Sequence, residues 1–323
     1  MNNDSKVWLN GNLIPWSEAT VPLLSHGFSR GSAFFEVFGI HVGPEGPMAF
    51  RMNQHLKRLM GSAELLEMEL AYSTEEIVAA VKTTVAANNL GRGLIKMLAY
   101  WGEEAIINLV LDTKLDLAVF AIPQSDDLKL DRAGALSACV SKWRKIHPAT
   151  VPVAAKACSN YLNGYLVRKD ANNRGFDLGI ALDTDGFLAE GSIESVFIVK
   201  DGVLKTPPLG RILSSITRMS ILEAVARIGI PAREGPISAA ELSEADEIFT
   251  CHTGIKVEPI ARLEDREFET PGPVTLQVMQ LMNDIIEFKD ERFMDWFQPL
   301  TLGSYTKGSQ ILKDEAADGS KAR

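Results

Sequence analysis

The segment VPVAAKACSNYLNGYL, Val151–Leu166, places one lysine, Lys156, among small and apolar neighbours. Ala155 and Ala157 flank it, so we expect its amine to be partly desolvated, which disfavours the charged form. A lysine of that kind can attack a carbonyl carbon and hold an aldehyde as a Schiff base. A lysine at the start of a helix, with its amine in water, would give the same letters. On this stretch alone, the exposed lysine is the simpler interpretation.

Length and composition restrict the class of protein. The 323 residues exceed the usual size of one hydrophobic core, which predicts two domains. With 46% hydrophobic and 23% charged residues, the chain resembles an ordinary globular protein, and no apolar run could span a bilayer. A net charge of −9 disfavours nucleic-acid binding, which needs clustered Lys and Arg. The five histidines show no metal-binding spacing, so we expect no metal.

The cysteines and the amino terminus indicate the cellular compartment. Cys139, Cys158 and Cys251 lie at wide spacings that suit neither a disulfide framework nor a zinc site. The polar start, Met1–Lys6, lacks the basic and then apolar pattern of a secretory signal. We therefore expect a cytoplasmic protein with reduced thiols.

Residues 1–122 are predicted to form a small α+β domain with an antiparallel sheet. Asn10-Gly11 between two apolar segments predicts a hairpin. Ser73 and Glu76 have the spacing of a capping box before a helix. The other predicted elements are a glycine-containing loop and buried strand over Ser25–Ile40, a helix over Gln54–Met68, and strands over Leu94–Trp101, Ile106–Leu111 and Leu115–Ile122. Residues 123–132 are the predicted linker.

Residues 133–300 are predicted to form a larger α/β domain. Asp185-Gly186 and Asp201-Gly202 each lie between strand-like runs and predict two hairpins. Ser214 or Ser215 is expected to cap a helix that ends at Gly229. The other predicted elements are a strand over Leu136–Trp143, a helix over Tyr161–Asn172, a strand and turn over Glu247–Ile260, and a carboxy-terminal helix through Val274 and Ile285. The polar composition of residues 301–323 predicts a disordered tail.

Five motifs, in this order, resemble those of the fold-type IV (class IV) aminotransferases. They are HLKRLMGSAELL (His55–Leu66), VPVAAKACSNYLNGYL, LAEGSIESVFIVKDGVLKTPP (Leu188–Pro208), LSSITR (Leu213–Arg218) and CHTGIKVEPI (Cys251–Ile260). The family includes branched-chain and D-amino-acid aminotransferases and aminodeoxychorismate lyase, and the branched-chain members are the most similar. The resemblance implies the D-amino-acid aminotransferase-like fold and pyridoxal 5'-phosphate as cofactor.

The resemblance also implies the chemistry around Lys156. This lysine would hold the cofactor covalently and then move the α-proton of the substrate. Glu190 would keep the pyridine nitrogen protonated, so that the ring withdraws electrons. Tyr161 would donate to the phenolic oxygen of the cofactor. A solvent-facing glutamate and a core tyrosine are the structural alternatives for the last two residues.

A second group of residues is expected at the phosphate of the cofactor. Arg58 matches the arginine that pairs with it, although an exposed helical arginine would look identical in sequence. Ile216 and Thr217 begin a helix, where free N–H groups and the helix dipole favour an anion. Thr253 would make the analogous second contact, and the amides of Thr253 and Gly254 would face the substrate carboxylate.

The expected substrate pocket departs from the branched-chain pattern. Phe35 matches an aromatic residue over the pocket. Arg30 stands where those enzymes usually have a tyrosine, and Leu94, Ile95 and Lys96 replace a Tyr-x-Arg triplet. Arg30 could pair with a carboxylate on the substrate. Arg30 and Lys96 are therefore candidate substrate-binding residues.

Transamination of a branched-chain amino acid with 2-oxoglutarate as acceptor is the first hypothesis. Aminodeoxychorismate lyase, or a D-amino-acid or amine transaminase, is the alternative on the same fold. A non-catalytic binding protein is a third, which intact Lys156, Glu190 and Arg58 disfavour. The expected partners are amino acids and 2-oxo acids, with neither nucleic acid nor membrane, and the family implies a homodimer or higher homo-oligomer.

Overall fold

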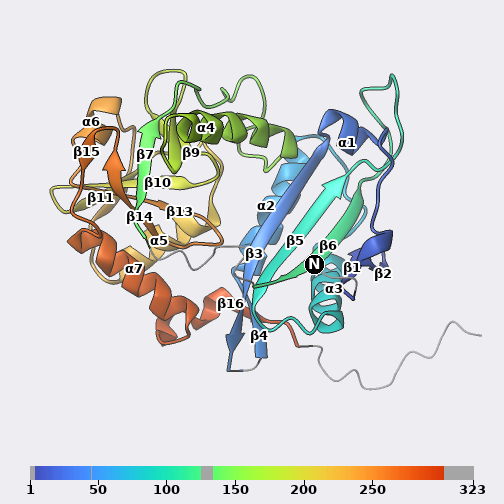
Figure 1. Ribbon diagram of the computed structural model, residues 1–323. Helices are drawn as coiled ribbons and strands as arrows, with labels where there is room; N and C mark the ends of the chain where they lie inside the picture. The colour runs from blue at the N-terminus through green and yellow to red at the C-terminus, as the bar shows by residue number, and fades with distance from the viewer. Residues whose placement is uncertain (1–3, 45, 125–133, 302–323) are drawn as a thin grey trace, which may run out of the picture.

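The computed structural model describes residues 4–44, 46–124 and 134–301. They form two β-sheets, which lie beside each other in Figure 1 with helices packed around them. We call the seven-stranded sheet the small sheet and the nine-stranded one the large sheet. This mixed α/β architecture agrees with the predicted fold class. Most of the predicted linker, and the predicted tail apart from Thr301, fall outside the described residues.

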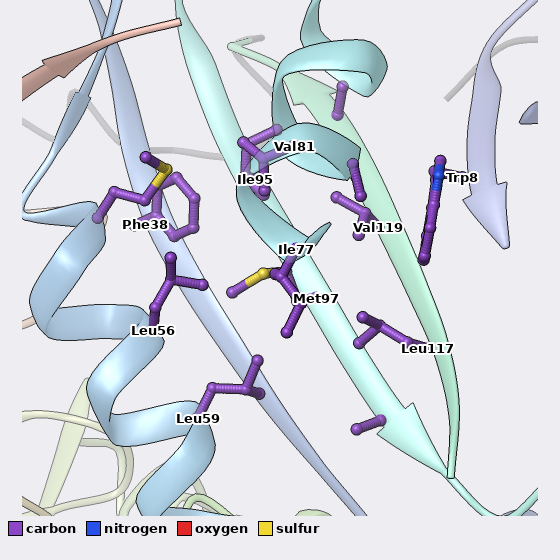
Figure 2. Packing of buried hydrophobic residues seen from close by; sticks show 14 of the residues in the cluster. Trp8, Phe38, Leu56, Leu59, Ile77, Val81, Ile95, Met97, Leu117 and Val119 are labelled. Atoms are coloured by element: carbon purple, nitrogen blue, oxygen red, sulfur yellow. The ribbon is translucent and has the colours of Figure 1, made fainter. Parts of the chain in front are cut away.

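The small sheet is antiparallel throughout, as predicted. Its strand order is β16 (Phe297–Pro299), β4 (Gly46–Phe50), β3 (Ala33–Gly43), β5 (Gly93–Tyr100), β6 (Asp116–Pro123), β1 (Lys6–Leu9) and β2 (Asn12–Pro15). Helices α2 (Met52–Leu65) and α3 (Thr74–Ala87) cover one face. Figure 2 shows Leu56 and Leu59 of α2 beside Phe38 and Met97 of the strands. Burial of these apolar side chains is what holds the helices on the sheet.

Local signals account for two of these elements. The Ser73 hydroxyl accepts a hydrogen bond from Glu76 N over 3.3 Å, and Ser73 N donates to Glu76 Oε2 over 2.8 Å, so the predicted capping box starts α3. Asn10 and Gly11 both have positive φ, which the tight turn of the β1–β2 hairpin requires.

The large sheet mixes parallel and antiparallel pairs. Its order is β12 (Ala232–Glu234), β11 (Val203–Thr206), β10 (Ser195–Lys200), β13 (Glu247–Cys251), β14 (Glu258–Leu263), β7 (Leu136–Val140), β8 (Leu178–Leu182) and β9 (Leu188–Gly191), with β15 (Arg266–Glu267) beside β14. Its helices are α4 (Tyr161–Asn173), α5 (Ile216–Arg227), α6 (Ala239–Ser243) and α7 (Pro273–Ile286). Both predicted DG hairpins, β8–β9 and β10–β11, are present.

The structure differs from the sequence prediction in three places. Ile106–Leu111 is not a strand and pairs with neither described sheet; Ile106 and Ile107 are instead 76% and 84% exposed, so their apolar side chains lie on the surface. The expected glycine loop contains a short helix, α1 (His26–Arg30). Residues 297–299, assigned by sequence to the second domain, form β16 of the small sheet. Among the described residues, no helix is long and apolar enough to cross a membrane.

Candidate active site

A cavity of about 360 Å³ lies between the two sheets, and we call it the main chamber. Strands β3 and β5 and helix α2 supply one wall, and segments of the large sheet supply the other. Its volume falls within the range of small-molecule sites. Phe35, Arg58, Lys156, Tyr161 and Glu190 all line it, although they come from four separate parts of the sequence.

Lys156 is fixed to the small sheet through its backbone. Its carbonyl accepts from Phe35 N over 3.1 Å, and its own N–H donates to Ser62 Oγ over 3.1 Å. Its side chain reaches Tyr161 at the start of α4, where Nζ donates to the phenolic oxygen over 2.6 Å. Burial, followed by the positive charge of Arg58, lowers the pKa of Lys156 to about 7. The alanine-rich setting thus makes this amine unusually easy to deprotonate.

Aromatic rings surround that amine. Lys156 Nζ lies 4.8 Å from the centre of the Phe35 ring, and the Phe35 and Tyr161 rings are 4.9 Å apart. Phe35 is on the face of β3 that lines the main chamber, while Phe34 beside it is fully buried in the small-sheet core. The alternation along β3 therefore places Phe35 at the site.

Glu190 stands at one end of the main chamber. It belongs to β9, is 9% exposed, and accepts from Leu213 N over 3.3 Å. Its other carboxylate oxygen forms an ion pair with Lys145. Glu190 is therefore a buried and partnered carboxylate, not a solvent-facing one. Sequence reasoning missed Lys145, because a lysine in the basic run KWRK gives no sign that it will meet a carboxylate from a distant strand.

Helix α5 begins at another part of the same wall. Ser215 is its N-cap and accepts from Arg218 N over 3.2 Å, and Ile216 lines the main chamber. Thr217 is 3% exposed and is not among the described lining residues. The first amides of a helix carry a partial positive charge, so this end of the main chamber suits an anion.

Arg58 is held against that helix start by a buried carboxylate. Its Nε and one terminal nitrogen donate to Glu36 over 2.6 and 2.8 Å, and the other terminal nitrogen donates to Ser214 O over 2.7 Å. Burial would raise the pKa of Glu36, but Arg58 and the hydrogen bond from His55 outweigh it and lower that pKa to about 2. Sequence reasoning missed Glu36 and His55, which orient the guanidinium.

The turn between β13 and β14 closes the main chamber. Thr253 Oγ1 donates to Val37 O over 3.3 Å, which joins the turn to β3. The Gly254 amide donates to His252 Nδ1 over 3.1 Å. Burial, together with nearby Lys256, lowers the pKa of His252 to about 4, so its ring is a neutral acceptor at pH 7. The Gly254 amide, which the sequence assigned to a substrate carboxylate, is thus already used within the turn.

Two predicted substrate residues lie apart from this group. Arg30 is exposed on α1 and donates to Ile106 O over 2.6 Å. Lys96 Nζ is 5.2 Å from the Phe35 ring centre. Neither residue is among those described as lining the main chamber.

A model of the family described as "Amino-transferase class IV" matches residues 33–263. The chain belongs to the class IV amino-transferase family. This range includes Lys156, Glu190 and the turn that contains Thr253, so the residues gathered at the main chamber lie within the matched region.

Individual class IV aminotransferases match over nearly the whole chain. The branched-chain-amino-acid aminotransferase of Salmonella typhimurium is 33% identical over 91% of this chain and 97% of its own, and that of Escherichia coli K12 is 32% identical over 90% and 96%. Among solved structures, the branched-chain aminotransferase of Thermoproteus uzoniensis with norvaline gives a TM-score of 0.87 at 35% identity, over 92% of this chain and 99% of that chain. The enzyme of Thermobaculum terrenum in its PLP form gives 0.86 at 31% identity, over 94% and 100%.

Class IV aminotransferases depend on pyridoxal phosphate, and the main chamber fits that group. It offers a lysine with an accessible free-base form, a buried carboxylate, and a helix start beside a guanidinium. These correspond to the needs of an aldehyde, a pyridine nitrogen and a phosphate.

Proposed function

We propose that this class IV aminotransferase transfers the amino group of a branched-chain amino acid to 2-oxoglutarate with pyridoxal phosphate as cofactor. The observation that carries the proposal is Lys156, whose amine has a pKa of about 7 and lies in one cavity with Glu190 and the start of α5. The branched-chain aminotransferases that match over nine-tenths of the chain support the choice of amino acid.

The residues of the main chamber would hold the cofactor at both ends. Arg58, the amides of Ile216 and Thr217, and Thr253 would bind its phosphate, and Glu190 would pair with the ring nitrogen. Tyr161 would donate to the phenolic oxygen. When bound, pyridoxal phosphate supplies an aldehyde carbon for the amino group and a ring that withdraws electrons from the carbon losing its proton.

Lys156 has two tasks in this proposal. Its amine would attach the cofactor, and its neutral form would take up and return the α-proton of the substrate. The same residue would serve the half-reaction of the amino acid and that of the 2-oxo acid. The Tyr161 hydroxyl, 2.6 Å from Nζ, orients the amine for this transfer.

The substrate would lie between Phe35 and the turn at Thr253 and Gly254. Phe35 offers an apolar surface to a branched side chain. Lys96, close to the Phe35 ring, and Arg30, on α1, would add positive charge outside the described lining of the main chamber, which favours an acidic acceptor.

Cofactor attachment and amino transfer test this function together. The protein loaded with pyridoxal phosphate is reduced with borohydride and digested, and mass spectrometry should place the cofactor on the peptide that contains Lys156. Lys156→Ala should lose both this label and turnover of leucine with 2-oxoglutarate, whereas Lys169→Ala, at an exposed lysine on α4, should keep both. Release of pyruvate from aminodeoxychorismate, without an amino acceptor, would contradict the transferase and indicate the lyase.

We further infer that two copies of the chain associate. Apolar side chains are exposed on α1 and on two adjoining segments, where Ala105 N donates to Leu24 O over 3.1 Å; they are Leu23, Leu24, Phe28, Ile106, Ile107, Leu109 and Val110. An apolar patch of this kind is typical of an interface. Light scattering should give twice the chain mass, and Ile107→Asp should halve it. Leu276→Asp, at an exposed leucine on α7, is the control.

A cytoplasmic location is part of the proposal. Cys139, Cys158 and Cys251 are free thiols in the fold, and Cys139 and Cys251 are buried. Free thiols suit a reducing compartment. Cell fractionation checks this assignment, and recovery of the protein with the membrane or exported fraction would contradict it.

A further inference from the structure

A second cavity of about 330 Å³ lies behind the turn that closes the main chamber, and we call it the second chamber. Its walls come from β3 and β5 of the small sheet and from α7 and the turn before β14. Leu94, Thr253 and Gly254 line both cavities, so the two chambers share one wall. A ligand in the main chamber is therefore adjacent to the second one.

Lys256 brings an ammonium group into the second chamber. It is 6% exposed, and its Nζ donates to the carbonyl of Thr253. Within the described part of the chain, no carboxylate forms an ion pair with it. Burial lowers the pKa of Lys256 to about 8, so the group still carries its proton at pH 7. A buried charge is costly unless an opposite charge accompanies it, and the described contacts of this ammonium, the Thr253 carbonyl and the Phe50 ring whose centre lies 5.0 Å away, include no anion.

His41 lines the second chamber from the end of β3. It is 9% exposed, and neither ring nitrogen has a hydrogen-bond partner among the described residues. Buried polar atoms are nearly always paired, so both nitrogens signal a missing partner. Burial, together with Lys256 and Arg92, lowers the pKa of His41 to about 3, and the neutral ring keeps one N–H to donate.

Further polar residues line the second chamber beside Lys256 and His41. Arg92 lines it and shares its guanidinium with Glu287 over 2.6 Å, and Asn283 on α7 lines it as well. Among the described lining residues, none is Asp or Glu. The second chamber therefore combines the Lys256 ammonium with N–H donors, and Glu287, which pairs with Arg92, is not among its described lining residues; this set repels a metal ion and favours an anion.

We propose that the second chamber binds a carboxylate group, held by the Lys256 ammonium and the His41 ring. A single ammonium and one neutral N–H match the two oxygens of one carboxylate. The shared wall at Leu94 allows two sources: the distal carboxylate of a dicarboxylate substrate seated in the main chamber, or a separate small carboxylate. The first source rests on the proposed function and would explain why the pocket can lack the usual Tyr-x-Arg triplet.

Calorimetric titration of the full chain loaded with pyridoxal phosphate tests this site, with glutarate and acetate as probes. Lys256→Met should weaken glutarate binding at least about tenfold, which is the loss expected for one charged hydrogen bond. Lys256→Arg should restore most of it, and His41→Phe should weaken it as well. Lys82→Met, which removes a lysine of α3 away from both chambers, should change nothing. Equal dissociation constants in the wild type and in Lys256→Met would overturn the proposal.

Competition separates the two sources of carboxylate. Isovalerate, a branched monocarboxylate, is first added to saturation. If glutarate then no longer binds, one dicarboxylate spans both chambers; if glutarate or acetate still binds and remains sensitive to Lys256→Met, the second chamber takes a separate carboxylate. If a thermal unfolding measurement shows that Lys256→Met is not folded, Lys256→Gln is used in its place. Cofactor loading is read separately from absorbance, so failure of the proposed function is distinguishable from failure of the carboxylate site.

Discussion

Lys156 Nζ and the Tyr161 hydroxyl oxygen lie 2.6 Å apart although one is on an extended segment and the other begins α4. Burial raises the pKa of Tyr161 and lowers that of Lys156 to about 7. The phenol therefore keeps its proton while the amine loses one near neutral pH. Because the pKa of the amine is the lower of the two, Lys156 is the nucleophile and base, and the Tyr161 phenol is its hydrogen-bonding partner.

The rate of cofactor uptake should follow the protonation of Lys156. Only the neutral amine attacks an aldehyde, so the association rate of pyridoxal phosphate with the apoprotein should rise with pH and level off above about 7. At pH 7 the neutral fraction is roughly a thousandfold greater than for an ordinary lysine. Stopped-flow absorbance measures this rate. A rate that keeps rising to pH 10 would contradict a buried, depressed amine.

Tyr161→Phe should reduce turnover and leave the fold intact. The substitution removes the hydroxyl that meets Lys156 but keeps the ring that packs 4.9 Å from Phe35. Loss of a hydrogen bond to a group that becomes charged costs about 1.5–3 kcal/mol, so kcat/KM should fall roughly ten- to hundredfold. Thermal unfolding should change little. Unaltered kinetics would show that the hydroxyl has no part in the reaction.

Arg58→Met should affect both stability and cofactor affinity. Glu36 is fully buried, and removal of its guanidinium partner leaves this charge with His55 as its one remaining described partner, which costs up to about 3–5 kcal/mol of unfolding free energy. The phosphate should also bind more weakly. Urea unfolding and fluorescence titration with pyridoxal phosphate measure the two effects.

The double variant Arg58→Met with Glu36→Gln separates those effects. The neutral amide should recover much of the lost stability, because no unpaired charge remains, while cofactor affinity stays low. Recovery of affinity along with stability would mean that Arg58 acts through the fold alone.

Acid should destabilise the protein through His252. Its folded pKa of about 4 lies below the ordinary value of 6.5, so the unfolded chain takes up the proton first as pH falls. The contribution is present above pH 6.5 and is lost between pH 6.5 and 4, up to about 3 kcal/mol. His252→Asn should flatten the dependence of unfolding free energy on pH by this amount.

His147→Asn is a matched control for that measurement. Both histidines accept, through Nδ1 over 3.1 Å, from the backbone N–H two residues later, but His147 is exposed. Its replacement should leave the slope unchanged. If both variants flatten the pH dependence of the unfolding free energy equally, burial of His252 is not the cause of that dependence.

Local signals in the sequence predicted the elements well and the long-range pairings poorly. The capping box at Ser73 and the turn at Asn10-Gly11 depend on adjacent residues, and both are confirmed. β16 could not be assigned in this way, because its place depends on β4, which lies far away in the chain. Ile106 and Ile107 were mistaken for a strand because apolar residues on a surface and in a sheet look alike in sequence.

For the candidate site as well, the sequence predicted the motif residues but not their long-range partners. The five motifs led to Lys156, Tyr161 and Glu190, and these do line one cavity. Lys145, which pairs with Glu190, and Glu36, which pairs with Arg58, are charged side chains with unremarkable neighbours in sequence, and only the folded chain shows what they contact. The roles of the cofactor-binding residues stay predictions until they are measured.

The position of β16 has a consequence for folding during synthesis. Until residues 297–299 leave the ribosome, β4 is an edge strand with its outer backbone groups unpaired. The amino-terminal half of the chain therefore cannot complete its sheet until the rest has been made. Such an open edge is a site for wrong pairing between nascent chains, and a chaperone that shields Gly46–Phe50 would protect the protein during that interval.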